Sequence, residues 1–483
     1  MNTNSPLVTD LYQLTMAHAA WRGGDHDTRV CFHLFFRKNP FSGGFALAAG
    51  LETALEYLEG LHFSEKEITY LATLTGADCR PLFHPDFLKM LQDFRFTCDV
   101  EAVPEGTPVF PHEPLLRVTG PWWQAQLVET ALLNQINFQT LIATKAARIC
   151  DAAAGGEVLE FGLRRAQGWD GALTASRAAY IGGCHATSNV LAGMTYGIPV
   201  RGTHAHSWVM FYEDETTAFS TYAEAMPNNC VFLVDTYDTL AGVLHAIEIG
   251  RRLREIGQDL LGIRLDSGDL AWLSRQARTL LDEAGFTQTK IVASNDLDEE
   301  LIESLRQQDA AIDVWGVGTK LITAYDQPAL GGVYKVGAVQ AEDGTWLPRI
   351  KLSEQSIKVT NPGRLQVRRF FDGTRMVADA IWNEDLGFAA EAPLHDLEDA
   401  IRTKRLPANL RHEDLLTPVL RDGRRLHPAR PLPDIRGHAL RQLECLDKSS
   451  RRIRHPHRYP AGVENRLWTL RNRLFDAAKG ESE

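Results

Sequence analysis

The feature that most constrains the fold is a rhythm of short apolar runs separated by helical patterns. The runs are VLEFGL (158–163), IPVRGTHA (198–205), CVFLVDT (230–236), GIRLDSG (262–268), KIVASND (290–296) and AIDVWGVGT (311–319). Strand–helix–strand spacing of this kind predicts parallel βα units. Because the runs are continuous rather than alternating, we expect strands covered on both faces. Six such units favour an α/β fold with an irregular parallel α/β barrel over an open sheet.

Different patterns flank this rhythm and divide the chain into three predicted segments. Residues 1–125 combine a helical stretch, an aromatic-rich strand pattern and short β-like runs, which indicates an N-terminal α/β domain. Residues 126–395 are assigned to the α/β barrel catalytic domain. Residues 396–483 form a basic C-terminal segment, an appendage whose charge differs from the rest: 401–483 carry 19 basic and 10 acidic residues, against 32 and 52 over 1–400.

Composition excludes several classes of function. A net charge of −11 gives no general case for a nucleic-acid partner. No apolar run approaches the roughly 18 residues of a membrane span, and no secretory signal is visible. The seven cysteines are scattered, odd in number and without a C-x-x-C pair. That usage fits a reducing compartment, so we expect a cytoplasmic protein without a membrane association.

Polar residues gather at the carboxyl ends of the apolar runs. They are Arg164, Thr203, His206, Asp235, Arg264, Asp266, Asn295, Asp296, Gly318 and Thr319. In a parallel barrel this rim is where catalytic residues lie. Each residue taken alone could instead be a helix N-cap or a turn former. The succession over six strand ends favours a functional site.

The residue types on this rim predict an anionic sugar ligand. An arginine side chain binds carboxylate or phosphate through two parallel hydrogen bonds. The glycine-rich GVGTK turn (316–320) could offer backbone N–H groups to a phosphate. Asp266 and Asp269 could take sugar hydroxyls and a hydrated magnesium ion, or could simply cap the following helix. Together these groups suit a phosphorylated sugar with a carboxylate co-substrate.

The histidine pair in RGTHAHSWVM (201–210) is open to several interpretations. If the stretch is extended, His204 and His206 point to one face. They could then be zinc ligands, a catalytic base with a helper, or two half-buried structural histidines. The residues themselves do not choose among these.

A family resemblance rests on motifs that occur in order from about residue 7 to beyond 360. They are TDLYQLTM, FHLFFRKNPFSGGFALAAGL, EFGLRRAQGWDGALTASRAAYIGG, TSNVLAG, GTHAHSW, DTYDTLAG, GIRLDSGDL, ASNDLDE, GVGTKL, LGGVYK and EQSIKVTNPG. The chain resembles nicotinate phosphoribosyltransferases of the type II phosphoribosyltransferase family. Residues past about 400 match no motif of that family. The resemblance implies nicotinate mononucleotide and pyrophosphate formation from nicotinate and phosphoribosyl pyrophosphate, coupled to ATP hydrolysis, in NAD salvage.

The resemblance also implies roles for residues around the pyridine ring. His206 matches the histidine that ATP phosphorylates, whereas His204 lies at a position that the motif does not fix. Thr203 matches a residue that contacts nicotinate, and Phe161 the aromatic side chain stacked on the ring. Tyr12 matches a tyrosine that covers the other face from the neighbouring subunit, which implies a homodimer with shared active sites.

Further matches concern the charged parts of the substrates. Arg264 matches the arginine that pairs with the nicotinate carboxylate, and Asp266 the acid on the ribose hydroxyls. The resemblance implies Mg²⁺ as cofactor but leaves its ligands open. Matches around the ribose phosphate are Arg164, Gly318 and Thr319, and possible pyrophosphate or ATP contacts are Arg37, Lys38 and Lys358.

Rival interpretations remain at this point. A nicotinamide phosphoribosyltransferase would place an acidic residue near the amide, where this chain has Ser188 and Asn189. A quinolinate phosphoribosyltransferase would be shorter and lack the histidine. A barrel metallohydrolase would use His204 and His206 as ligands, but the later strands end in poor zinc ligands such as Arg264. A non-catalytic relative has no support, since every matched position is filled.

Overall fold

The computed structural model describes residues 5–353, 359–389, 392–397, 399 and 401–479. Contacts divide the chain into two compact units, which we call unit 1 (1–141 and 329–483) and unit 2 (142–328). Unit 1 is therefore built from both ends of the chain. The segments predicted at 1–125, 126–395 and 396–483 divide the sequence, whereas these units group contacts, so those boundaries stay a prediction.

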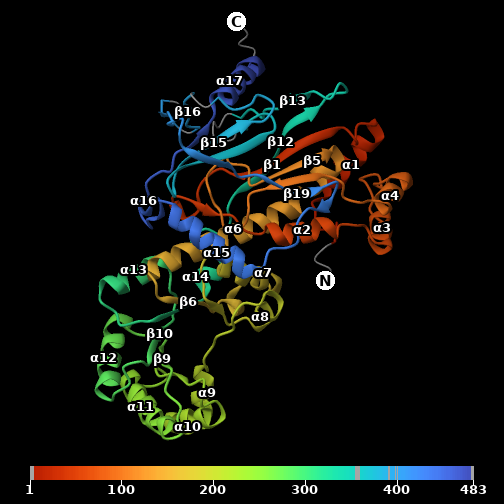
Figure 1. Ribbon diagram of the computed structural model, residues 1–483. Helices are drawn as coiled ribbons and strands as arrows, with labels where there is room; N and C mark the ends of the chain where they lie inside the picture. The colour runs from red at the N-terminus through yellow and green to blue at the C-terminus, as the bar shows by residue number, and fades with distance from the viewer. Residues whose placement is uncertain (1–4, 354–358, 390–391, 398, 400, 480–483) are drawn as a thin grey trace. The chain divides into compact units, whose positions relative to one another are not determined.

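Unit 2 contains a six-stranded parallel sheet (Figure 1). Its order is β7-β6-β11-β10-β9-β8, with strands β6 (Glu157–Glu160), β7 (Ala186–Thr187), β8 (Val231–Leu233), β9 (Gly262–Leu265), β10 (Lys290–Ala293) and β11 (Val314–Val317). Its helices are α7 (Trp169–Ile181), α8 (Val190–Tyr196), α9 (His206–Phe211), α10 (Glu215–Ala225), α11 (Thr239–Glu255), α12 (Leu270–Glu283), α13 (Glu299–Gln307) and α14 (Thr319–Ile322), with the 3₁₀ turn η2 (Leu163–Arg165). The predicted α/β class is confirmed.

The backbone ladder of this sheet does not run from β8 back to β7 within the described residues. Residues 198–205, predicted as a strand, make one parallel bridge, Thr187 to Val200. The prediction of a strand there is wrong: a proline and a glycine interrupt the run, which makes one bridge and continues as irregular chain. On the other side, the Leu233 N–H of β8 donates to His204 Nε2 at 3.2 Å. The His204 side chain thus connects residues 198–205 to β8, which is an edge strand of the sheet.

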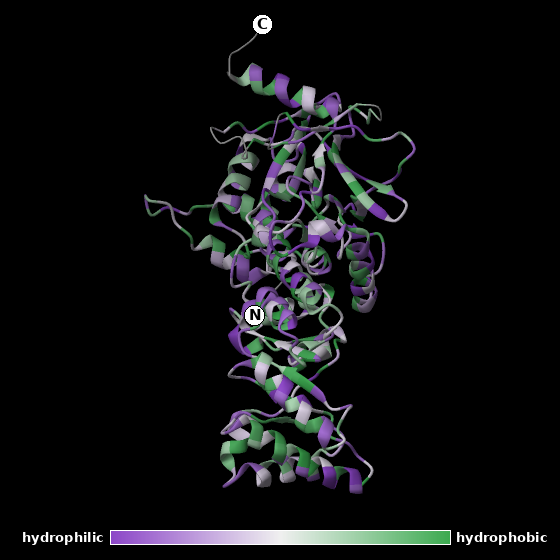
Figure 2. Cartoon of the chain, turned by 90° about the vertical axis from the view of Figure 1, so that its left-hand side faces the viewer, coloured by the Kyte–Doolittle hydropathy of each residue, from purple (hydrophilic) through white to green (hydrophobic). Residues whose placement is uncertain are grey.

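Sequence explains how four helices of unit 2 begin. Asp214, Asp238, Asp269 and Asp298 are N-caps, each accepting a backbone N–H two or three residues into its helix. The helices carry hydrophilic and hydrophobic residues in alternation along their length (Figure 2). Their apolar faces cover strands that are buried on both sides, as the continuous apolar runs predict.

Unit 1 contains two larger sheets and one strand pair. The seven-stranded sheet has the order β13 (Trp346–Pro348), β12 (Gly332–Gln340), β1 (Arg29–Phe36), β5 (Leu116–Pro121), β3 (Asp99–Ala102), β19 (Thr417–Arg421) and β20 (Arg424–Arg425). The six-stranded sheet has the order β17 (Thr403–Lys404), β16 (Leu394–His395), β21 (Ala461–Val463), β15 (Arg375–Asn383), β14 (Leu365–Asp372) and β18 (Arg411–Asp414). β2 (Ala46–Leu47) pairs with β4 (Pro108–Val109).

Helices of unit 1 come from both ends of the chain. They are α1 (Leu11–Gly23), α2 (Leu51–Glu59), α3 (Glu65–Ala72), α4 (Pro85–Gln92), α5 (Trp122–Leu127), α15 (Leu432–Cys445), α16 (Lys448–Arg451) and α17 (Asn465–Lys479), with the 3₁₀ turn η1 (Pro40–Ser42). The long helix α6 (Glu129–Ala153) runs through the boundary between the units. Among the described residues, no helix combines the length and apolar character needed to cross a bilayer.

Candidate active site at the carboxyl ends of the unit 2 strands

Arg264, near the end of β9, is the centre of the site. Its Nε–H donates to Ser294 Oγ at 2.9 Å and its Nη1–H donates to Thr203 Oγ1 at 3.1 Å. Its Nη2 lies 3.3 Å from Asp266 Oδ1, and the side chain is 13% exposed. Three nitrogen atoms of the guanidinium thus contact residues from three different segments. The side chain is held in one orientation before any ligand arrives.

Phe161 lies beside this arginine. The Arg264 guanidinium carbon is 5.8 Å from the centre of its ring. The Phe161 N–H donates to the Val317 carbonyl at 2.8 Å, which extends the pairing of β6 with β11 by one residue. Gly316 gives the ring its room, because a Cβ there would lie 2.8 Å from two ring carbons. A flat apolar face next to a fixed cation suits an aromatic carboxylate.

His206 is the first residue of α9. The extended conformation considered for residues 201–210 therefore ends before this histidine. Its Nδ1 lies 3.1 Å from Thr236 Oγ1, and its Nε2 lies 3.6 Å from Asp266 Oδ2. The side chain is 40% exposed. Each ring nitrogen therefore faces a separate oxygen, and the imidazole remains accessible.

His204 has a different environment. Its ring is buried and packs among Phe219, Tyr222 and Phe232, while Nε2 accepts the Leu233 N–H. Burial lowers the pKa of His204 to about 4. This geometry makes His204 a structural residue. The two histidines do not face a shared position, as a pair of metal ligands would.

A pair of carboxylates follows β8 and β9, but it is not the predicted pair. Asp235 Oδ2 accepts the Asp266 N–H at 2.8 Å and the Ser267 hydroxyl at 2.6 Å. Asp235 Oδ1 is buried and has no hydrogen-bond partner among the described residues. Asp269 instead caps α12 by accepting the Trp272 N–H at 3.0 Å. Asp269 thus has the N-cap role that the sequence left open as the alternative, and Asp235 contacts the backbone of Asp266.

Gly318 and Thr319 begin α14, directly after β11. A Cβ on Gly318 would lie 3.4 Å from the Phe161 carbonyl oxygen, so this turn passes close to the chain that follows β6. Arg164 is exposed in η2, and the close approach of Gly162 to Ile322 places that turn against α14. The three residues predicted at the ribose phosphate thus come from two neighbouring turns.

Three predicted residues lie in unit 1, and a fourth is outside the described residues. Tyr12 is in α1 of unit 1 and is 48% exposed. Arg37 and Lys38 directly follow β1, also in unit 1. Lys358 lies outside the described residues. Their roles therefore stay predictions.

Two contributing residues were missed by the sequence analysis. Ser294 accepts from Arg264 and donates to Asp266, so it connects two predicted substrate contacts. Thr236 contacts His206. A signal was present in both cases, because each residue directly precedes or follows a residue of the rim, Asn295 or Asp235. Asn295 and Asp296 themselves have φ of 92° and 43°, a strained turn of the kind found at functional sites.

Comparison with known proteins gives three family matches along the chain. The nicotinate phosphoribosyltransferase N-terminal domain matches residues 7–137, the nicotinate phosphoribosyltransferase family residues 157–364, and its C-terminal domain residues 364–471. The third match covers most of the region past 400 in which the sequence analysis found no motif. That region is therefore a recognisable part of the same family rather than an unrelated appendage.

Whole-chain similarities agree. The nicotinate phosphoribosyltransferase of Bacillus subtilis is 44% identical over 485 residues, covering 99% of this chain and 96% of that protein. The protein of the same name from Dictyostelium discoideum is 38% identical, covering 98% and 89%. The crystal structure of human nicotinic acid phosphoribosyltransferase superposes with a TM-score of 0.83 at 32% identity, covering 96% and 99%.

Proposed function

This chain belongs to the nicotinate phosphoribosyltransferase family, and from that premise we propose that it couples nicotinate mononucleotide synthesis to ATP hydrolysis through a phosphohistidine at His206. The substrates are nicotinate, phosphoribosyl pyrophosphate and ATP. The observation that carries the proposal is the arrangement of His206 and Arg264 around one carboxylate, Asp266. The enzyme acts in NAD salvage.

Nicotinate binds with its carboxylate on Arg264 and its ring on Phe161. The geometry that supports this is the fixed guanidinium beside a half-buried aromatic ring. A charge-assisted contact of this kind discriminates strongly between a carboxylate and a neutral amide. The residues where a nicotinamide enzyme would carry an acid do not oppose an anion: Asn189 caps α8, accepting the Ala192 N–H at 3.2 Å.

The sugar phosphate binds next to this ring. Asp266 takes the ribose hydroxyls, and Arg164, Gly318 and Thr319 surround the 5-phosphate. Attack by the pyridine nitrogen on the anomeric carbon needs no general base, because that nitrogen carries no proton. As the bond to pyrophosphate breaks, positive charge develops on the sugar. The protein's part is to align the nucleophile and to hold the leaving group.

Mg²⁺ is the proposed cofactor. Asp235 and Asp266 would hold it or its water molecules, and the buried, unpartnered Asp235 Oδ1 fits an oxygen ligand of a hard cation. When bound, the ion neutralises charge on the departing pyrophosphate. Arg37, Lys38 and Lys358 stay proposed contacts for pyrophosphate or ATP.

His206 accepts the γ-phosphoryl group of ATP. If Nδ1–H donates to Thr236, the lone pair of Nε2 is free to attack phosphorus, and ADP leaves. Water later hydrolyses the phosphohistidine to free enzyme and phosphate. Asp266 lies near the same nitrogen. Phosphorylation of His206 therefore changes the charge next to the residue that binds the ribose.

The test is a matched pair of histidine variants. His206→Ala should lose ATP-dependent phosphorylation and ATP hydrolysis and keep at most slow, uncoupled transfer. His204→Asn should keep the phosphoenzyme, since its ring serves the connection to Leu233. Radiolabelled ATP and peptide mass spectrometry read out the phosphate. A phosphate located on His204, or retained in His206→Ala, contradicts the assignment.

Assembly and compartment complete the proposal. We infer a homodimer in which Tyr12 covers the ring of the substrate bound by the partner, as its exposed position in α1 allows. All seven cysteines are free thiols, which supports a reducing, cytoplasmic location.

A further inference from the structure

Glu160 is the last residue of β6, and it is 1% exposed. It directly precedes Phe161, the proposed ring contact of nicotinate, and Arg164 follows in the next turn of the chain. The reaction chemistry proposed above gives this carboxylate no role. A carboxylate loses its hydration when it is buried, so its presence at this position needs a physical explanation.

Three neutral donors surround the Glu160 carboxylate. The Gly162 N–H donates to Oε1, and the hydroxyls of Thr187 and Ser176 donate to Oε2 at 2.6 and 2.8 Å. Among the described residues these are the hydrogen bonds of its side chain, and no cation pairs with it. The donors belong to the chain after β6, to β7 and to α7. One carboxylate thus connects three segments of unit 2.

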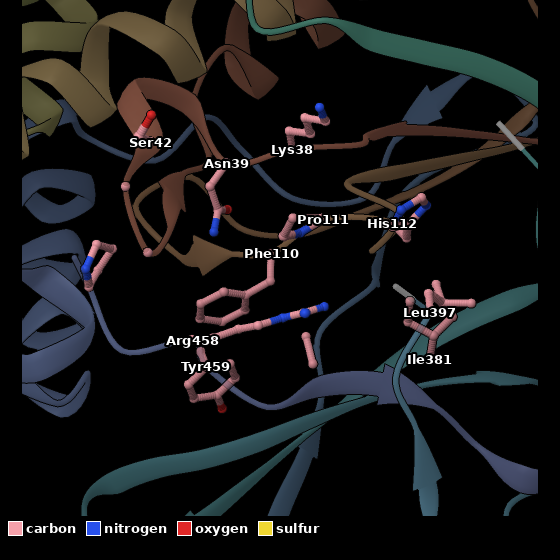
Figure 3. A pocket seen from close by; sticks show the side chains of 14 residues that line it. Lys38, Asn39, Ser42, Phe110, Pro111, His112, Ile381, Leu397, Arg458 and Tyr459 are labelled. Carbon is pink, nitrogen blue, oxygen red and sulfur yellow. The ribbon is translucent and has the colours of Figure 1, made fainter. Parts of the chain in front are cut away.

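A buried carboxylate of unit 1, Asp379, is held differently. It accepts from Arg369 Nε at 2.9 Å, and both side chains of this ion pair are fully buried. It also accepts from the hydroxyl of Tyr459 at 3.0 Å, a side chain that lines a cavity of unit 1 (Figure 3). Glu160 has no such counterion, so only neutral hydrogen bonds offset its desolvation. Stability alone is therefore a poor explanation for a carboxylate at residue 160.

The direction of the hydrogen bonds requires an acceptor on both sides of this side chain. Asn189 Nδ2–H donates to Ser176 Oγ at 3.3 Å, and the Asn189 N–H donates to Thr187 Oγ1 at 3.0 Å. Each hydroxyl thus accepts from Asn189 and has its own hydrogen available for Glu160. Since the Gly162 N–H is also a donor, Glu160 faces donors on both sides. A carboxylate satisfies them, whereas an amide has one oxygen and brings a further donor.

The segments that Glu160 connects carry proposed substrate contacts. Gly162 is the N-cap of η2, which contains Arg164. Its bond to Glu160 therefore fixes the turn by which the chain passes from Phe161 to that arginine. The Glu160 carbonyl also accepts the Ser188 N–H at 2.9 Å, in the stretch where a nicotinamide enzyme would carry its acidic residue. Side chain and backbone of one residue thus hold the chain on both sides.

We propose that Glu160 is a positioning residue for nicotinate and phosphoribosyl pyrophosphate, an inference that rests on the function proposed above. Its carboxylate holds the backbone of Phe161 and Arg164 in the binding conformation before the substrates arrive. Both contacts act in the bound substrates and in the transition state alike. Loosening them therefore raises KM and changes kcat little. A purely structural residue would instead lower the fraction of folded enzyme, which reduces kcat at unchanged KM.

The test is Glu160→Gln in the full-length enzyme, with steady-state kinetics for each substrate varied in turn. The KM for nicotinate and the KM for phosphoribosyl pyrophosphate should each rise about 10-fold, while kcat falls less than about 3-fold. Thr187→Val removes one hydroxyl donor and should raise both KM values. In the double variant the two effects should not add, because both changes break the same network.

Glu157→Gln is the matched control. It makes the same substitution at the opposite end of β6 and should leave both KM values unchanged. Thermal unfolding of each variant measures its stability separately from its kinetics. If Glu160→Gln does not fold, Thr187→Val and Ser176→Ala decide by the same KM criterion.

Two outcomes overturn the proposal. The first is a folded Glu160→Gln enzyme whose KM values stay within about 2-fold of the parent values. The second is a kcat that falls together with the unfolding temperature at unchanged KM, which would make Glu160 a structural residue. In both cases an active parent enzyme leaves the proposed function standing. A parent chain that forms no nicotinate mononucleotide overturns the proposed function and this inference with it.

Discussion

At the scale of single residues, the orientation of Arg264 depends on a serine. Ser294 Oγ accepts the Arg264 Nε–H at 2.9 Å and donates to Asp266. The hydroxyl therefore connects the proposed carboxylate contact to the proposed ribose contact. Without it the guanidinium keeps its charge but loses one of three constraints. Ser294 acts as a positioning residue, not as a ligand of the substrate.

Ser294→Ala should raise the KM for nicotinate about 10-fold, which corresponds to about 1.4 kcal/mol. The physical reason is that Arg264 must regain its orientation on binding, at a cost in side-chain entropy. The KM for phosphoribosyl pyrophosphate should rise less, because Asp266 also contacts Asp235 through its backbone. Steady-state kinetics with each substrate varied in turn measures both values.

The matched control is Ser274→Ala, another buried serine of unit 2, whose Oγ bonds the Ala271 carbonyl and the Ala311 N–H away from the site. It should lower stability without a selective change in either KM. Arg264→Ala should give the largest increase in the KM for nicotinate, and it sets the upper limit for the effect of Ser294→Ala. A Ser294→Ala enzyme that loses both substrates equally would show that the serine serves general stability instead.

At the scale of elements, the pairing of β6 with β11 places the aromatic wall of the site. Gly316 in β11 leaves space for the Phe161 ring, because a Cβ would approach two ring carbons to 2.8 Å. Gly316→Ala should therefore displace the ring and raise the KM for nicotinate about 10-fold. Gly171→Ala in α7, where a Cβ meets nothing within 4 Å, should be neutral or slightly stabilising. Equal kinetics for the two variants would argue against ring stacking.

Element prediction succeeded for most of the apolar runs and failed at two places. The runs over 230–236, 262–268 and 290–296 contain β8, β9 and β10. β7 has two residues, Ala186–Thr187, too few for any periodic pattern to appear. The run 198–205 has the apolar residues of a strand, but it contains a proline and a glycine and makes one bridge.

The sequence predicts which residues belong to the site, but it does not predict which of them contact one another. The rim positions of Arg264, Asp266 and Thr203 follow from the ends of the apolar runs. The contact between Asp235 and Asp266 follows from β8 lying beside β9, a neighbour relation that no local pattern contains. The RLDSGDL motif offers a pairing of Asp266 with Asp269 as one of two interpretations. The N-cap geometry of Asp269 at α12 was the ordinary alternative.

At the scale of the whole molecule, buried neutral histidines make stability depend on pH. Burial lowers the pKa of His33 to about 3 and those of His112, His204 and His438 to about 4. The ordinary value is about 6.5, so below it the unfolded chain binds protons that the folded chain does not. The free energy of unfolding should therefore fall as pH drops from about 6.5 towards 4.

Urea unfolding at pH 7.5, 6.0 and 5.0 measures this slope. His204 alone can account for about 3 kcal/mol over the full range, given its burial. His204→Asn should be less stable at pH 7.5 but should lose less stability on acidification than the parent chain. A parent chain whose stability is flat between pH 7.5 and 5.0 would show that these rings gain protons without unfolding.

The assembly prediction concerns Tyr12, which is exposed in α1 although it is aromatic. If it covers the partner's substrate, each active site of an isologous dimer is incomplete in a monomer. Mixing Tyr12→Ala with His206→Ala subunits, each nearly inactive alone, should restore about a quarter of the parent activity in a random mixture. Size-exclusion chromatography of tagged subunits confirms that mixed dimers form. Mixed dimers without restored activity would place Tyr12 and His206 in the same site of one chain.

Unit 1 takes strands from both ends of the chain, and this has a consequence for synthesis on the ribosome. β1 pairs early with β5, but its other neighbour, β12, lies about 300 residues later, with Val30 opposite Val339. At 5–20 residues per second that neighbour emerges roughly 15–60 s after β1. During that interval the nascent strand RVCFHLFF has an open, apolar edge. We expect the newborn chain to need a chaperone there until β12 (Gly332–Gln340) emerges, shortly after β11 (Val314–Val317), the last strand of unit 2.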